Sequence, residues 1–177
     1  MYLIMKRVIA IFLVAICFCS CNSESNFSNP TEIDLVTGMY LVDNVANSVG
    51  KVGNPNVLQS NVSVTLYPNP SLDILNVISG SSIKNIWIIK GIPTSNFNNT
   101  DFNSVLKPNL YSNFEIKNKS IFDVENINGK NSIQIDLASF EKGYYRVFVE
   151  LEDGLISWDN IYFRASQFEI DEINYWN

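Results

Sequence analysis

The sequence predicts an all-β fold, a small antiparallel β-sandwich of the immunoglobulin-like kind. Short runs of Val, Ile, Leu, Phe, Tyr and Trp recur along the chain, and Asn and Gly separate them at short intervals. No stretch repeats its apolar residues with helical spacing over three turns. Many short strands with turn residues between them are typical of a sandwich or a barrel.

Nine segments of the 177-residue chain have the composition or the alternation of strands. In chain order they are Met39–Asp43, Val62–Tyr67, Asp73–Ile78, Ile83–Lys90, Phe114–Lys117, Ile121–Glu125, Ser132–Leu137, Tyr144–Leu151 and Leu155–Arg164. The expected organisation is an extra strand or hairpin at 38–60, a main domain at 61–165 with an insertion at about 92–130, and a tail at 166–177. In the tail, Tyr175 and Trp176 are expected to dock on the sandwich, to cap an edge strand or to stack on a sugar.

The last two predicted strands form the clearest element, a β-hairpin. Asp153-Gly154 between two alternating runs predicts a two-residue type I′ turn, because both turn positions need a positive φ. In that register Leu151 pairs with Ile156, and Val149 pairs with Trp158. One face of the hairpin would then be apolar except at Asn160, with Tyr145, Val147, Val149, Leu151, Ile156, Trp158 and Tyr162 on it.

The first 20 residues have the organisation of an export signal. Lys6 and Arg7 precede Val8–Phe18, an unbroken apolar run of 11 residues. A membrane-spanning helix needs about 20 apolar residues, so this run is interpreted as the core of a signal peptide.

The end of the apolar run, Phe18–Cys21, resembles a lipobox, with Ser20 in the small position before the cysteine. The resemblance implies that Cys21 is lipidated and becomes the new N-terminus, attaching the protein to a membrane. An ordinary signal peptide, with Cys21 as a simple thiol, remains the alternative. The polar residues that follow predict a flexible tether over 21–37.

Composition excludes several kinds of chemistry. The chain has no histidine, and its three cysteines all lie within the first 21 residues, so His-based dyads and thiolate metal clusters are excluded. A net charge of −6 argues against nucleic acid as a partner and against electrostatic adhesion to anionic lipid. We expect no catalytic residues, no metal and no cofactor. Calcium bound by Asp- and Asn-containing loops and a glycan hydrolase acting through carboxylates remain the weaker alternatives.

The segment YPNPSLDILNV, Tyr67–Val77, resembles the opening of the type IX secretion system type A sorting domain. Gly143 and Tyr145 match the Gly-x-Tyr that precedes a late strand in that family, and Ile83–Gly91 matches a strand between the two motifs. The resemblance spans about residues 61–165. It implies a small antiparallel β-sandwich that an outer-membrane export machine recognises.

The YPNP motif also has a direct physical reading. Pro68 and Pro70 each fix one φ angle and remove one hydrogen-bond donor, and Pro70 keeps Asn69 out of the α region. The strand that ends at Tyr67 must therefore stop, and the chain must turn. A simple β-turn and a recognised sorting motif both fit this pattern.

Three features separate this chain from an exported cargo with a sorting domain: only a short segment precedes the domain, the connection Ile92–Lys130 is longer than is usual in the family, and a tail follows the last strand. The lipobox also implies a second export route. We therefore expect a non-enzymatic envelope lipoprotein of a diderm bacterium, anchored to the outer membrane and binding an envelope protein or a polysaccharide. The alternative is a type IX targeting domain.

Overall fold

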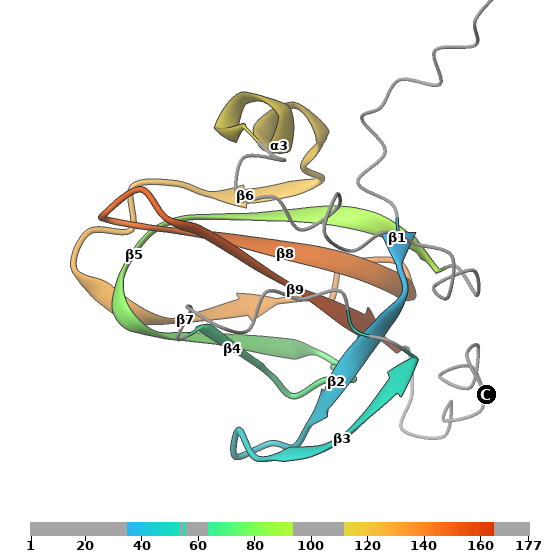
Figure 1. Cartoon of the computed structure of the whole chain (residues 1–177). Coiled ribbons are helices and arrows are strands. Elements are labelled where there is room, and N and C mark those ends of the chain that lie inside the picture. Colours follow the sequence, from blue (N-terminus) through green and yellow to red (C-terminus); the bar gives the residue numbers. More distant parts are fainter. Residues whose placement is uncertain (1–34, 54, 56–63, 94–111, 165–177) are drawn as a thin grey trace, which may run out of the picture. The chain divides into compact units, whose positions relative to one another are not determined.

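The computed structural model describes residues 35–53, 55, 64–93 and 112–164. These residues form antiparallel sheets curled into a β-sandwich, with one short helix (Figure 1), and they confirm the predicted all-β fold class. The chain divides into two units after residue 32, and every described residue belongs to the second. The predicted signal peptide, Cys21, most of the tether and the tail at 166–177 lie outside the described residues.

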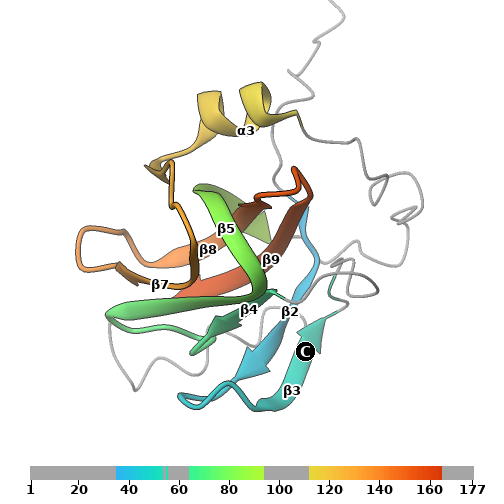
Figure 2. The ribbon, with the colours of Figure 1, turned by 90° about the vertical axis from the view of Figure 1, so that its left-hand side faces the viewer.

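One long strand, β5 (Ile74–Pro93), belongs to both layers of the sandwich. The sequence predicts two strands here, Asp73–Ile78 and Ile83–Lys90, and that prediction is wrong because the strand is continuous. The pairing register shifts between Ile78 and Ile83 on one side of the strand and between Ile83 and Asn85 on the other. Such irregularities bend a strand, and Figure 2 shows β5 bending from one layer into the other.

The two halves of β5 pair with different strands. The first half pairs with β4 (Val64–Tyr67) and β7 (Lys130–Asp136), and the second half pairs with β6 (Phe122–Val124), β8 (Gly143–Leu151) and, in parallel, β1 (Leu35–Val36). The strand β9 (Ile156–Phe163) pairs with β8. The main core lies between the layers and contains Leu66, Leu75, Val77, Ile86, Ile88, Ile135, Tyr145, Val147, Val149 and Ile161, all nearly or fully buried.

The β8–β9 hairpin differs from the prediction by one residue. Its loop has three residues, because Leu151 N–H donates to the Leu155 carbonyl at 2.9 Å and Gly154 N–H donates to the Leu151 carbonyl at 2.9 Å. Only Gly154 in the loop has a positive φ, +85°. A turn closed by a left-handed glycine is the usual three-residue hairpin connection, and Asp-Gly fits it as well as the predicted two-residue turn.

This shift of one residue moves every β9 side chain to the opposite face. Phe148 pairs with Trp158, in place of the predicted Val149, and Glu150 pairs with Ile156. Ile161 joins the main core. The predicted apolar face is therefore wrong for β9: its even-numbered side chains lie outside the main core, on the face that carries Tyr144, Arg146 and Phe148.

The segment predicted as a strand at Phe114–Lys117 is the helix α3 (Asn113–Lys119). The Ser112 hydroxyl accepts from the Glu115 N–H at 3.3 Å, and the Glu115 carboxylate accepts from the Ser112 N–H at 3.0 Å. This capping box starts the helix. Ile116 is fully buried against the outer face of the sheet, beside Trp87 and Phe148. The apolar residues of this segment alone suit a strand. The Ser-x-x-Glu spacing of Ser112 and Glu115 is the sequence signal for a helix start that the prediction did not include.

The strands β2 (Gly38–Val42) and β3 (Ser48–Gly53) form a separate two-stranded hairpin. The carboxylate of Asp43 closes the turn by accepting from the Val45 N–H at 2.9 Å and from the Asn47 N–H at 2.8 Å. Met39 on β2 is fully buried in a small cluster with Tyr144 and Tyr162 of the main sheet, whose rings lie 4.8 Å apart. The hairpin thus packs on the outer face of β8 and β9.

Replacing Gly154 by Ala should lower the free energy of unfolding by about 1–2 kcal/mol, the cost of a left-handed conformation for a residue with a Cβ. Nothing lies within 4 Å of the added Cβ, so a steric clash would not contribute. Urea denaturation followed by tryptophan fluorescence measures the loss. Glu152→Ala, an exposed change in the same loop, is the control and should alter stability by less than about 0.5 kcal/mol. Equal stability of Gly154→Ala and the wild type would contradict the left-handed conformation of Gly154.

Candidate functional site

The motif Tyr67-Pro68-Asn69-Pro70 forms the turn that follows β4, as the sequence predicts. The strand ends at Tyr67, and the Tyr67–Pro68 and Asn69–Pro70 peptide bonds are both cis. Asn69 lies at the centre of the turn and is only 2% exposed.

The main chain and the side chain of Asn69 bind two different strands. Its backbone exchanges two hydrogen bonds with Val42 of β2, both 2.9 Å. Its Nδ2 donates to the Tyr40 carbonyl at 2.7 Å and to the Asn160 carbonyl at 2.9 Å, and its Oδ1 accepts from the Tyr162 N–H at 3.1 Å. The buried amide therefore has partners for both donors and for its acceptor, as a buried polar group requires.

The same turn covers part of the outer edge of β9. The Ser71 N–H donates to the Tyr162 carbonyl at 2.9 Å, and the Arg164 N–H donates to the Ser71 carbonyl at 3.0 Å. Together with the Asn69 side chain, these bonds pair the edge groups of β9 at Asn160 and Tyr162. An uncovered edge would be free to pair with another chain.

A second buried amide, that of Asn160 on β9, also binds the β2–β3 hairpin through a hydrogen bond to β2. Its Nδ2 donates to the Gly38 carbonyl at 2.9 Å, and its Oδ1 accepts from Arg146 Nε at 2.9 Å. The guanidinium of Arg146 also lies 4.1 Å from the centre of the Trp158 ring, a cation–π contact. Asn160 was not predicted as a site residue. Its position as the single polar residue on the predicted apolar face was nevertheless a sequence signal that it has a specific buried partner.

The second predicted motif, Gly143 and Tyr145, lies beside the first. Gly143 is opposite Phe163 in the β8–β9 pair, and Phe163 also forms a bridge with Ser71. The Tyr145 ring is buried in the main core, and its hydroxyl donates to the Glu141 carbonyl. The fold thus brings the two motifs to either side of the C-terminal end of β9.

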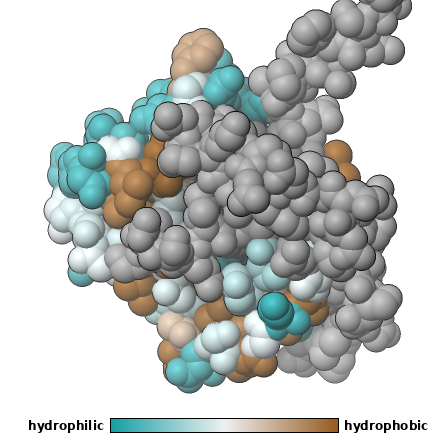
Figure 3. Space-filling view, viewed as in Figure 1, coloured by the Kyte–Doolittle hydropathy of each residue, from teal (hydrophilic) through white to brown (hydrophobic). Residues whose placement is uncertain are grey.

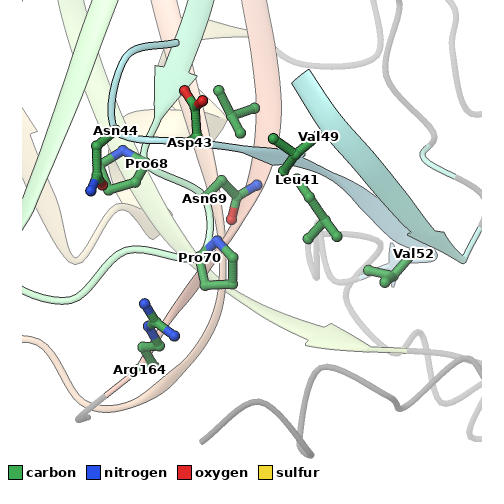
Figure 4. Close-up of a pocket in the computed structure, with 10 residues that line it drawn as sticks. Leu41, Asp43, Asn44, Val49, Val52, Pro68, Asn69, Pro70 and Arg164 are labelled. Atoms are coloured by element: carbon green, nitrogen blue, oxygen red, sulfur yellow. The ribbon is translucent and has the colours of Figure 1, made fainter. Parts of the chain in front are cut away.

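A pocket of about 380 Å³ opens beside the YPNP turn (Figure 4). It lies between the turn and the β2–β3 hairpin, with Arg164 at its side. Its lining residues are Leu41, Val42, Asp43, Asn44, Val49, Val52, Pro68, Asn69, Pro70 and Arg164. Of the predicted motif residues, Pro68, Asn69 and Pro70 line it, and Gly143 and Tyr145 do not.

The lining is mainly apolar, with one acidic and one basic side chain. Two valines of the hairpin are exposed, Val49 at 63% inside the pocket lining and Val45 at 72% beyond it. Figure 3 shows apolar surface interspersed with hydrophilic residues over the hairpin, at the bottom of the view. Hydrogen bonds from the Asn47 and Val45 N–H groups lower the pKa of Asp43, so its carboxylate is charged at neutral pH and is engaged in the turn.

The pocket lining combines apolar surface with a few polar side chains. The lining offers apolar surface, the guanidinium of Arg164 and a carboxylate that already closes a turn, without a nucleophile paired with a base. In the described part of the chain, no group of three or more Cys, Asp or Glu residues could hold a metal ion. No helix among the described residues is long and apolar enough to cross a membrane.

Sequence reasoning found the turn and missed the hairpin residues of the pocket, Leu41, Val49 and Val52, as well as Arg164. These residues carry no motif, and hydrogen bonds between segments distant in the chain assemble them with the turn. Comparison with known proteins found no matching family model, no matching curated protein and no matching solved structure.

A half-buried carboxyl group, Asp159, lies on β9 next to Asn160. Burial raises its pKa to about 7, while the Asn160 N–H bonded to it at 2.6 Å and the charge of Arg146 act in the opposite direction. Between its unfolded pKa near 3.8 and pH 7, the folded protein holds a proton that the unfolded chain has lost. Stability therefore falls as pH rises through this range.

Replacing Asp159 by Asn should remove this pH dependence. We expect the melting temperature of the wild type to fall between pH 5 and pH 8, and that of Asp159→Asn to fall less, because the amide does not ionise. Differential scanning calorimetry across that range measures both. Asp123→Asn, at an exposed position on β6, should follow the wild-type curve. Parallel curves for Asp159→Asn and the wild type would contradict the raised pKa.

Replacing Asn69 by Ala should lower the free energy of unfolding by at least about 3 kcal/mol, because it leaves three backbone groups, one on β2 and two on β9, without their partner, at about 1–3 kcal/mol each. Asn69→Asp keeps the acceptor and loses both donors, so it should also destabilise. Asn128→Ala, in an exposed turn, should change stability by less than about 0.5 kcal/mol. Urea denaturation measures all three, and a mild effect at Asn69 would refute its proposed role.

Proposed function

We propose that this protein is a non-enzymatic, lipid-anchored envelope protein whose β-sandwich binds an envelope protein or a polysaccharide. The observation that carries the proposal is the apolar pocket beside the YPNP turn, with the exposed Val49 at its mouth. Apolar lining with a few placed polar groups is the usual chemistry of a binding pocket. The lipobox ending at Cys21 supplies the anchor, and the acidic net charge argues against nucleic acid.

The arrangement of the hairpin supports a binding role. Asn69 and Asn160 tie β2 to the main sheet, whereas β3 has mostly exposed side chains. A rigidly held hairpin with exposed valines can present apolar surface to a partner with little ordering cost. The partner would contact the pocket mouth, where Val49, Pro68 and Pro70 are at least partly accessible.

A type IX targeting domain is the second candidate, and one observation favours it. The two motif halves, YPNP and Gly143-x-Tyr145, lie on either side of Phe163 and form one region. Asn69 and Tyr145 are buried and bonded within the fold, so a receptor would contact the partly exposed proline rings next to them. The receptor would then bind the surface formed by the proline rings, and the buried residues Asn69 and Tyr145 would only hold that surface in place.

The anchor and the export route can be tested together in cells. We expect the wild type in the membrane fraction and Cys21→Ala released, because the variant lacks the acylated thiol. Proteinase shaving of intact cells, with and without type IX secretion, then separates the two candidate functions. Shaving that is independent of type IX secretion supports the lipoprotein, and shaving that requires it supports the targeting domain. Membrane retention of Cys21→Ala would overturn the anchor.

The binding role can be tested with a photoreactive phenylalanine at position 49 in intact cells. We expect a discrete cross-linked adduct from position 49 and a much weaker one from position 45, which is at least as exposed on the same hairpin but does not line the pocket. Mass spectrometry identifies the partner, and periodate oxidation of the adduct distinguishes a polysaccharide from a protein. Equal labelling from both positions would show that the pocket does not select a partner.

A further inference from the structure

The chain leaves the sandwich at the side of the pocket. The N–H of Arg164 is bonded to Ser71 of the turn, and the Arg164 side chain lines the pocket. The next residues, 165–177, are outside the described part of the chain. The last described residue, Arg164, therefore belongs to the lining of the pocket.

The sequence of this segment, ASQFEIDEINYWN, combines apolar side chains with acidic ones. Phe168 and Ile170 alternate with Glu169 and Asp171, which is the pattern of an extended segment with one apolar face. Ile173, Tyr175 and Trp176 add apolar surface further along. The apolar residues gain free energy only if they leave water.

The pocket matches this segment in reach and in charge. Phe168 follows Arg164 by four residues, and four extended residues span at most about 14 Å. The apolar lining suits an aromatic side chain, and Lys51 on the exposed strand β3 together with Arg164 offers positive charge to Glu169, Asp171 and Glu172. Among the described residues, β3 pairs with β2 alone, so one edge of β3 can accept a further strand.

We infer that residues 165–177 are the occupant of this pocket, with Phe168 inserted into it and the following residues extended along β3. The segment thereby acts as a ligand carried by the same chain. The regulatory consequence rests on the proposed function: an external partner that uses the pocket must displace the segment first, so its apparent affinity is reduced by the fraction of time the pocket is filled.

The inference is tested with a photoreactive phenylalanine at position 168 of the full chain, extracted from membranes. After irradiation and digestion, mass spectrometry should find cross-links from position 168 to residues 38–53 or 67–70 of the same chain. The same probe at Phe114, exposed on α3, should give none to these residues. Cross-links from position 168 only to other regions, or between two copies in a dimer band, would overturn the inference.

Two matched substitutions on the hairpin complete the test. Val49→Asp places a charge in the apolar lining and should reduce the cross-link yield roughly tenfold. Val45→Asp, at a position at least as exposed but outside the lining, should leave the yield unchanged. Equal yields for both variants would overturn the inference. Because no partner takes part, this failure is distinct from a failure of partner binding in cells.

Discussion

The side-chain amide of Asn69 is the interaction on which the arrangement of the described sheets depends. It lies between β2 and β9 and binds backbone groups of both, while its own backbone forms a bridge with Val42. A buried amide with all its partners is stabilising, and one without them is costly. The strand β4 ends at Tyr67, just before Pro68, and the Asn69 amide lies in the following turn at the edge of β9. The hairpin, the covered edge and the pocket all follow from that position.

The register of β9 matters for the site because it determines which face of the sheet carries the Asn160 side chain. Because the β8–β9 loop has three residues, Asn160 faces the hairpin and binds Gly38, while Ile161 enters the core. With a two-residue loop, Asn160 would face the core and its amide would be buried without these partners. The turn residues and the buried amides therefore agree on one register, as expected of a sequence that specifies a single structure.

Alternation and turn residues were enough to predict the fold class and most strands, because both are local. The wrong predictions have one cause in common: each of these short sequence segments is compatible with two local structures. Asp153-Gly154 suits two loop lengths, the small residues at 80–82 suit a turn or a bend within β5, and Phe114–Lys117 suits a strand until the Ser112 cap is considered. The pocket could not be predicted, because long-range hydrogen bonds bring its hairpin residues to the turn and no sequence pattern marks that contact.

Exposure separates the two roles that the YPNP motif can have. Asn69 is buried and fully bonded, so its loss would harm binding and secretion through unfolding, whichever function the protein has. Pro68 and Pro70 are partly exposed and line the pocket, so they can contact a partner directly. A surface change at Val49 leaves the buried hydrogen bonds intact and alters only the mouth of the pocket. Substitutions at exposed positions such as Val49, and not at the buried Asn69, can therefore separate an effect on partner recognition from an effect on folding.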